Sequence, residues 1–100
     1  MPRELLDSEI ERLQNEVLSL GEMVEKSILE AVQSLKTRDF EASRRVISQD
    51  RSINEKRFAI EADTLVLIAT QQPLASDLRL LASILDIISE LERIADYAKG

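Results

Sequence analysis

The chain has no cysteine and no histidine among its 100 residues. These absences exclude disulfide frameworks, thiol chemistry, the usual zinc sites, and serine or cysteine triads, because each depends on a thiol or an imidazole. Di-iron bundles built on Glu-x-x-His motifs are excluded for the same reason. Any metal ion bound by this chain must therefore be held by oxygen ligands.

Turn-forming and aromatic residues are scarce, with two glycines, two prolines, two phenylalanines and one tyrosine. Sheets and sandwiches need turn residues at short intervals, so a fold with few connections remains. The hydrophobic share of 44% is typical of a globular domain, and its core must be mostly aliphatic. These counts predict an all-α protein that forms one domain over residues 1–100.

Basic residues are the minority, 13 against 19 acidic ones, which gives a net charge of -6. This balance opposes binding to nucleic acid or to an anionic membrane and favours a protein partner or a cation. The longest run without a charge, between Asp63 and Asp77, is shorter than the roughly 20 residues that span a bilayer. Residues 1–10 carry acids where a signal peptide is apolar. We expect a cytoplasmic protein without membrane insertion.

The first predicted helix begins at Asp7 or Ser8, or earlier after Pro2, and ends near Thr37. Its apolar seam consists of Leu6, Ile10, Leu13, Val17, Leu20, Val24, Ile28, Ala31 and Leu35. The steps of three and four residues are those of a helix with one buried face. Gly21 lies beside this seam, and its lack of a side chain predicts the close approach of a neighbouring helix.

A second helix is predicted from a cap at Asp39, starting near Phe40, to residues 70–72, where Pro73 must end it. Its apolar seam repeats every seven residues and consists of Val46, Ile53, Ile60 and Leu67. A polar strip borders the seam and consists of Asp50, Asn54, Arg57 and Glu61. Arg57 and Glu61 are one turn apart, so we expect them to pair.

The third predicted helix starts at Ser76 or Asp77, where either residue can cap it. Its core face comprises Leu78, Leu81, Ile84, Leu85, Ile88, Leu91 and Ala95, widened by Leu80, Ile87 and Ile94. Three long helices with short connections predict an antiparallel three-helix bundle. Because the third helix carries more apolar surface than such a bundle covers, we also expect a homodimer or larger homo-oligomer.

Glu92 and Asp96 are the strongest candidates for chemistry. They lie one turn apart at the margin of the third helix's apolar arc, and no basic residue lies between them on that face. Two such carboxylates repel each other, so a cation or a basic group from another helix must compensate. The pair predicts a site for a hard ion such as Mg²⁺, Mn²⁺, Ca²⁺ or Fe³⁺, or else solvated acids or a salt bridge between helices.

Asp77 and Arg79 lie at the start of the third helix. A carboxylate is favoured at the positive end of the helix dipole, which predicts a capping role for Asp77. Arg79 is disfavoured there, so we expect it to pair with an acid of another helix.

Three segments of the chain, together with Gly21-Glu-Met-Val24, resemble the PhoU family of phosphate-signalling proteins. They are Arg45-Val-Ile-Ser-Gln-Asp50-Arg-Ser-Ile-Asn54, Gln72-Pro-Leu-Ala-Ser-Asp77-Leu-Arg79 and Glu90-Leu-Glu92-Arg-Ile-Ala-Asp96. The resemblance covers nearly all of the chain. It implies one three-helix repeat, the amino-terminal one of two. The apolar pattern of the third helix is still running at Gly100, so either Gly100 caps this helix or the helix continues beyond it.

The resemblance also implies site residues and partners. Glu92 and Asp96 correspond to a metal-binding motif, for which iron, manganese, magnesium and zinc are the candidate ions, and Asp50, Asn54, Asp77 and Arg79 occupy further motif positions. The implied function is non-enzymatic. It is negative regulation of phosphate uptake and of the phosphate-starvation response, as an adaptor between the ATPase subunit of a phosphate ABC transporter and a sensor histidine kinase. The alternatives are a carboxylate-based metal-binding protein with an enzymatic or storage role, and a plain structural bundle.

Overall fold

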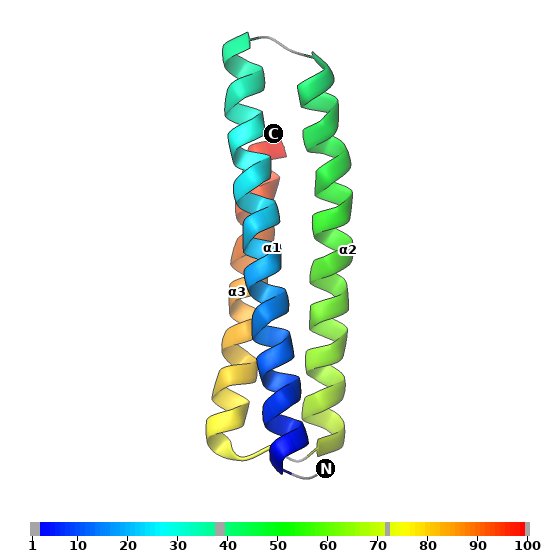
Figure 1. Cartoon of the computed structure of the whole chain (residues 1–100), viewed down its shortest axis with the longest axis vertical. Coiled ribbons are helices and arrows are strands. Elements are labelled where there is room, and N and C mark those ends of the chain that lie inside the picture. Colours follow the sequence, from blue (N-terminus) through cyan, green and yellow to red (C-terminus); the bar gives the residue numbers. More distant parts are fainter. Residues whose placement is uncertain (1–2, 38–39, 72, 100) are drawn as a thin grey trace.

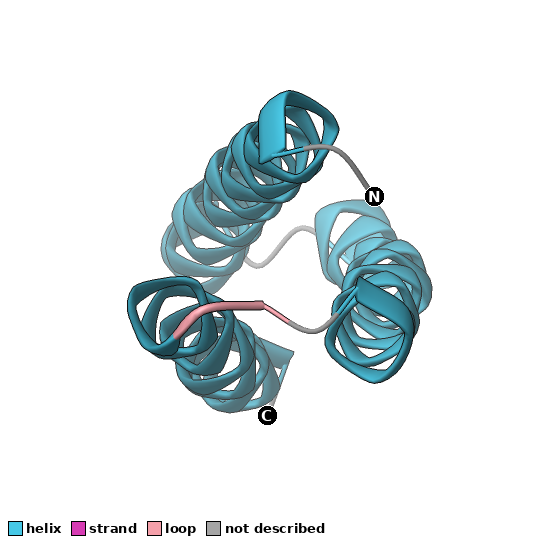
Figure 2. Cartoon of the chain, turned by 90° about the horizontal axis from the view of Figure 1, so that it is seen from below, coloured by secondary structure: helices cyan, strands magenta, loops and turns pink. Residues whose placement is uncertain are grey.

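Three long helices make up the fold in the computed structural model, which describes residues 3–37, 40–71 and 73–99. They are α1 (Arg3–Thr37), α2 (Phe40–Gln71) and α3 (Ala75–Lys99). Each helix contacts the other two, and α2 runs antiparallel to α1 and α3 in a bundle 53 Å long (Figure 1). Seen along the bundle, the helices lie at the corners of a triangle (Figure 2). The predicted all-α three-helix bundle is confirmed.

The helix boundaries follow the sequence signals, with shifts of a few residues. α1 begins at Arg3, the earlier of the predicted starts, and Asp7 lies inside it with Oδ1 3.2 Å from Arg3 Nη2. α2 spans the predicted range and ends at Gln71, before Pro73. The predicted cap at Asp39 lies outside the described residues.

α3 begins at Ala75, so Asp77 stands within the first turn and not ahead of it. The backbone N–H of Leu74 donates a hydrogen bond to Asp77 Oδ2 at 3.1 Å, and the N–H of Leu78 donates to the carbonyl of Leu74 at 2.9 Å. This is the reciprocal half of a capping box, in which the third helical residue reaches back to the cap residue. Asp77 therefore stabilises the start of α3 from inside the helix.

The core runs along the bundle axis between the three seams. Its buried apolar residues include Leu6, Ile10, Leu13, Leu20 and Val24 from α1, Val46, Ile53, Ile60 and Leu67 from α2, and Leu81, Ile84, Ile88 and Ala95 from α3. The seven-residue seam predicted for α2 is thus confirmed in full. Leu78, predicted on the core face of α3, is exposed.

The end of α1 departs from its predicted seam. Leu35 is exposed, whereas Ser34 and Ser27 are buried. α3 has 25 residues against 35 in α1 and 32 in α2, and Figure 1 shows its last turn short of the end of α1 and the start of α2. At this end of α1 the buried position is thus Ser34, one residue before the predicted Leu35.

The close helix approach predicted at Gly21 is wrong. A Cβ atom built at Gly21 meets nothing within 4 Å beyond the glycine's own surroundings in the helix. The glycine faces open space on the flank of α1.

Candidate functional site

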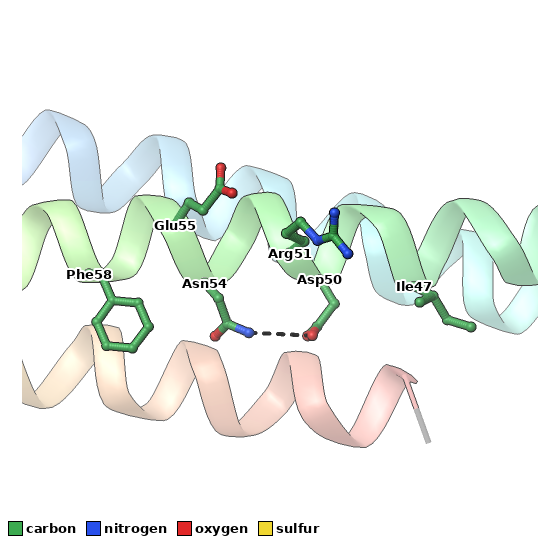
Figure 3. A pocket seen from close by; sticks show the side chains of 6 residues that line it. All are labelled: Ile47, Asp50, Arg51, Asn54, Glu55 and Phe58. Atoms are coloured by element: carbon green, nitrogen blue, oxygen red, sulfur yellow. Dashed lines mark hydrogen bonds between the residues drawn. The ribbon is translucent and has the colours of Figure 1, made fainter.

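A groove of about 440 Å³ runs along α2 beside the last turns of α3 (Figure 3). Its lining residues all come from α2: Ile47, Asp50, Arg51, Asn54, Glu55 and Phe58. The side chains of Asp50, Asn54 and Phe58 point toward α3, whereas Glu55 points away from it. Because 3.6 residues make a turn, residues three and four apart on α2 share this face.

Two predicted motif residues meet in this groove. Asp50 is buried and Asn54 is half-buried, and Asn54 Nδ2 donates a hydrogen bond to Asp50 Oδ2 at 3.4 Å. Their spacing of one turn, read from the sequence, is therefore realised as a direct contact. The pair offers an amide oxygen and a carboxylate on the α3 side of α2.

Arg57 lies deeper in the interface between α2 and α3, with 9% of its surface exposed. Its Nη1 donates a hydrogen bond to Glu61 Oε2 at 2.8 Å, which confirms the predicted pair one turn apart. Its Nε lies 2.7 Å from Glu92 Oε2 on α3. The Nε–H is buried and not aligned for a hydrogen bond, so this second contact is an ion pair only.

Glu92 and Asp96 therefore have different surroundings. The carboxylate of Glu92 is compensated by a basic group from another helix, one of the outcomes that the sequence left open. Asp96 is exposed and makes no ion pair with any described residue. Lying one turn after Glu92, it is on the same side of α3, which faces α2.

A second polar cluster joins the ends of two helices. Arg3 of α1 binds the carboxylate of Asp77 in α3 through both terminal nitrogens, with Nη2 donating to Oδ1 at 2.9 Å and Nη1 to Oδ2. Asp77 is 2% exposed. Hydrogen bonds from Arg3, aided by the Leu74 N–H, lower the pKa of the Asp77 carboxyl against the opposing effect of desolvation. The cluster ties the start of α1 to the turn before α3.

Arg79 is not part of this cluster. Its side chain is exposed, and the ion pair predicted for it is absent from the part of the chain that the structure describes. Its guanidinium is left in solvent beside the exposed Leu78 and Leu80.

Two contacts of the site were missed by the sequence analysis. The Arg57–Glu92 pair had a usable signal, because Asp50, Arg57 and Thr64 repeat every seven residues beside the apolar seam and are all buried. The Arg3–Asp77 pair had none, since 74 residues separate its members and only the antiparallel path of α2 brings them together.

Neither a metal-ligand cluster nor a membrane span is present among the described residues. Residues 3–37, 40–71 and 73–99 contain no group of three or more acidic, histidine or cysteine side chains placed to hold a metal ion. Within the same ranges, no helix has the length and apolar character needed to cross a bilayer.

Comparison with known proteins identifies the family. The PhoU domain matches residues 17–100. The phosphate-specific transport system accessory protein PhoU of Edwardsiella tarda is 39% identical over 92 residues, which are 92% of this chain and 38% of that protein. The protein of the same name from Escherichia coli K12 is 38% identical over 92 residues, with the same coverage of each chain.

A more distant relative agrees with these two. The PhoU homolog of Streptococcus pneumoniae serotype 4 is 37% identical over 98 residues, or 98% of this chain and 45% of that protein. This chain thus spans less than half the length of the curated relatives that it matches. No solved structure matches it. Since the matched region covers all three helices in whole or in part, the chain belongs to the PhoU domain family.

Proposed function

We propose that this chain acts in the cytoplasm as a regulatory module of high-affinity phosphate uptake. The observation that carries the proposal is the PhoU domain over residues 17–100, together with relatives named as phosphate-specific transport system accessory proteins. An elongated acidic bundle without thiol or imidazole is suited to presenting helix faces to protein partners. In the proposed role it carries out no catalysis.

The partners we propose are the ATPase subunit of a phosphate ABC transporter and a sensor histidine kinase. The module bridges the two and holds the kinase in its inactive signalling state while phosphate is plentiful. Exposed side chains with no role in the bundle are the ones available for such contacts. Arg79, with the exposed Leu78 and Leu80 on either side of it, provides a charge and apolar area at the start of α3.

The test is capture of the purified ATPase subunit and of the kinase's cytoplasmic part by the immobilised chain. We expect Arg79→Ala to weaken capture of one or both partners. Arg44→Ala, which removes an exposed arginine from α2, serves as the matched control and should leave capture unchanged. Absence of binding to either partner by the unmodified chain contradicts the adaptor role.

A second proposal concerns a hard metal ion at Glu92 and Asp96. Carboxylate oxygens fit iron, manganese or magnesium in kind, and zinc less well. They fall short in number, because Arg57 already neutralises Glu92 and the described residues hold no cluster of three ligands. We therefore propose that the pair contributes to a cation site that acids outside this chain complete, and that this chain alone binds the ion weakly or not at all.

Measurement of the bound metal tests whether Glu92 and Asp96 are ligands of the proposed cation site. Glu92→Gln with Asp96→Asn, introduced into a protein that carries two such repeats, should lower the metal bound per molecule after purification. Glu90→Gln with Asp86→Asn removes the same charge from exposed positions of α3 and is the control. Equal metal content in the two double variants and the unmodified protein removes Glu92 and Asp96 from the site.

A further inference from the structure

Arg57 lies in the interface between α2 and α3, where it already contacts the carboxylate proposed as a metal ligand. Its guanidinium contacts Glu61 through Nη1 and Glu92 through Nε, at 2.8 and 2.7 Å. The two carboxylates come from different helices and approach the same cation. Glu92 is thus engaged before any metal arrives.

The surroundings of Arg57 shield its guanidinium from water. The guanidinium carbon of Arg57 lies over the Phe58 ring, 4.0 Å from the ring centroid. Only 11% of the Arg57 side chain is exposed, against 39% for Glu61 and 32% for Glu92. A shielded cation attracts the half-exposed acids more strongly than a solvated one, because less water screens the interaction.

The contact with Glu92 is nevertheless incomplete. The buried Nε–H has no aligned hydrogen-bond acceptor, although the Glu92 oxygen is close. A charge pair without an aligned hydrogen bond forgoes part of the energy of a charge-assisted one. Glu92 can therefore be drawn to another cation more readily than Glu61, which accepts an aligned hydrogen bond.

We propose that the guanidinium of Arg57, buried in the interface between α2 and α3, and a hard metal ion compete for the carboxylate of Glu92. This inference rests on the metal site proposed above and goes beyond it by naming the group that keeps the metal out. Removal of Arg57 leaves Glu61 and Glu92 with uncompensated negative charge, which a divalent cation then relieves.

The experiment is a Mn²⁺ titration of the whole 100-residue chain, freed of metal by a chelator and followed by electron paramagnetic resonance. Arg57→Gln should bind Mn²⁺ about tenfold more tightly than the unmodified chain. A tenfold change in affinity equals the free energy of a pKa shift of about one unit. Arg57→Gln combined with Glu92→Gln should lose that gain. A gain that survives the loss of Glu92, or no gain at all, overturns the proposal.

Arg93→Gln is the matched control for net charge. Arg93 is an exposed arginine of α3 that pairs with Glu90 at 3.2 Å. It should leave Mn²⁺ affinity unchanged, and an equal gain in this variant assigns the effect to overall charge and overturns the role of Arg57. Circular dichroism checks that each variant is folded.

If Arg57→Gln fails to fold, Arg57→Lys provides the same test. Lysine keeps the charge but loses the planar fork that reaches both acids. A gain in Mn²⁺ affinity smaller than that expected for glutamine supports the proposal, and no gain contradicts it. The Mn²⁺ titration of this chain and the metal content of a two-repeat protein are separate measurements, so failure of this inference can be told from failure of the proposed metal site.

Discussion

At the scale of single residues, the best-defined polar contact is the bidentate pair between Arg3 and the buried Asp77. Burial of a carboxylate is unfavourable unless hydrogen bonds compensate for the lost water. Asp77 receives two from Arg3 and one from the backbone of Leu74. One side chain therefore caps α3 and anchors α1.

This contact makes stability depend on pH. Because the pKa of Asp77 is lower in the folded protein than its ordinary value of 3.8, its contribution to stability is fully present above that value. It is lost as pH falls through the folded pKa. Urea unfolding of Asp77→Asn should therefore show a deficit against the unmodified protein at pH 7 that shrinks below about pH 4.

Asp86→Asn is the control for this prediction, since it removes an exposed carboxylate of α3 with no ion pair among the described residues. It should change the free energy of unfolding little at pH 7. A deficit of Asp77→Asn that is the same at pH 7 and at pH 2 contradicts the assignment.

Gly21 is a position where a substitution should raise stability. A glycine inside a helix lowers stability relative to alanine, and open space surrounds its missing Cβ. Gly21→Ala should raise the free energy of unfolding by about 0.5–1 kcal/mol in chemical denaturation. The reverse change at an exposed helical site, Ala59→Gly, should lower it by a similar amount. A destabilised Gly21→Ala would reveal a close contact on that flank.

Arg79 should separate stability from function. Its exposed side chain has no partner in the described part of the bundle, so Arg79→Ala should change the free energy of unfolding by less than about 0.5 kcal/mol. In cells, the same change in the complete protein should weaken repression of a phosphate-starvation reporter. Unfolding of the domain by this variant assigns Arg79 a structural role instead.

At the scale of helices, α2 combines two lines that each repeat every seven residues. One consists of Val46, Ile53, Ile60 and Leu67, and the other of Asp50, Arg57 and Thr64. All of these residues are buried, and the second line carries the polar contacts toward α3 and within α2. A helix can bury such a line only when each polar group finds a partner.

The packing of α1 predicts that Leu20 and Leu18 differ strongly in their contribution to stability. Leu20 is fully buried, whereas Leu18 is 66% exposed. Leu20→Ala should lower the free energy of unfolding by about 2–5 kcal/mol because it leaves a cavity. Leu18→Ala should change it by less than about 0.5 kcal/mol. Equal effects of the two changes in urea unfolding would contradict the packing of α1.

At the scale of the whole molecule, α3 presents an apolar row that the bundle leaves uncovered. Leu80, Ile87 and Ile94 repeat every seven residues with 42–46% of each exposed. Such a row is typical of a seam between helices of different molecules.

We therefore predict that the chain self-associates through this row. Sedimentation at high micromolar concentration should show a homodimer, and Ile87→Glu should shift it to monomer. Leu65→Glu, at a similarly exposed position of α2, is the control and should leave the dimer intact. A monomer at every concentration contradicts the prediction.

Much of the fold was determined by the sequence alone. Helical spacing of apolar residues, the scarcity of turn residues and the position of Pro73 set the number, order and approximate bounds of the helices. These are local properties, because hydrogen bonds within a helix join residues four apart and proline acts on its nearest neighbours. The Arg57–Glu61 pair could be predicted for the same reason, because its two residues are one helical turn apart.

The contacts between helices were decided only by the tertiary structure. Arg3 meets Asp77, Arg57 meets Glu92, and Leu35 is exposed although its spacing placed it on the apolar seam. The spacing of Glu92 and Asp96 predicted that a positive charge must compensate them, but it could not predict that Arg57 is the group that pairs with Glu92. A helix fixes the angle at which each side chain leaves its axis, whereas its rotation and offset against a neighbour depend on how all three helices pack.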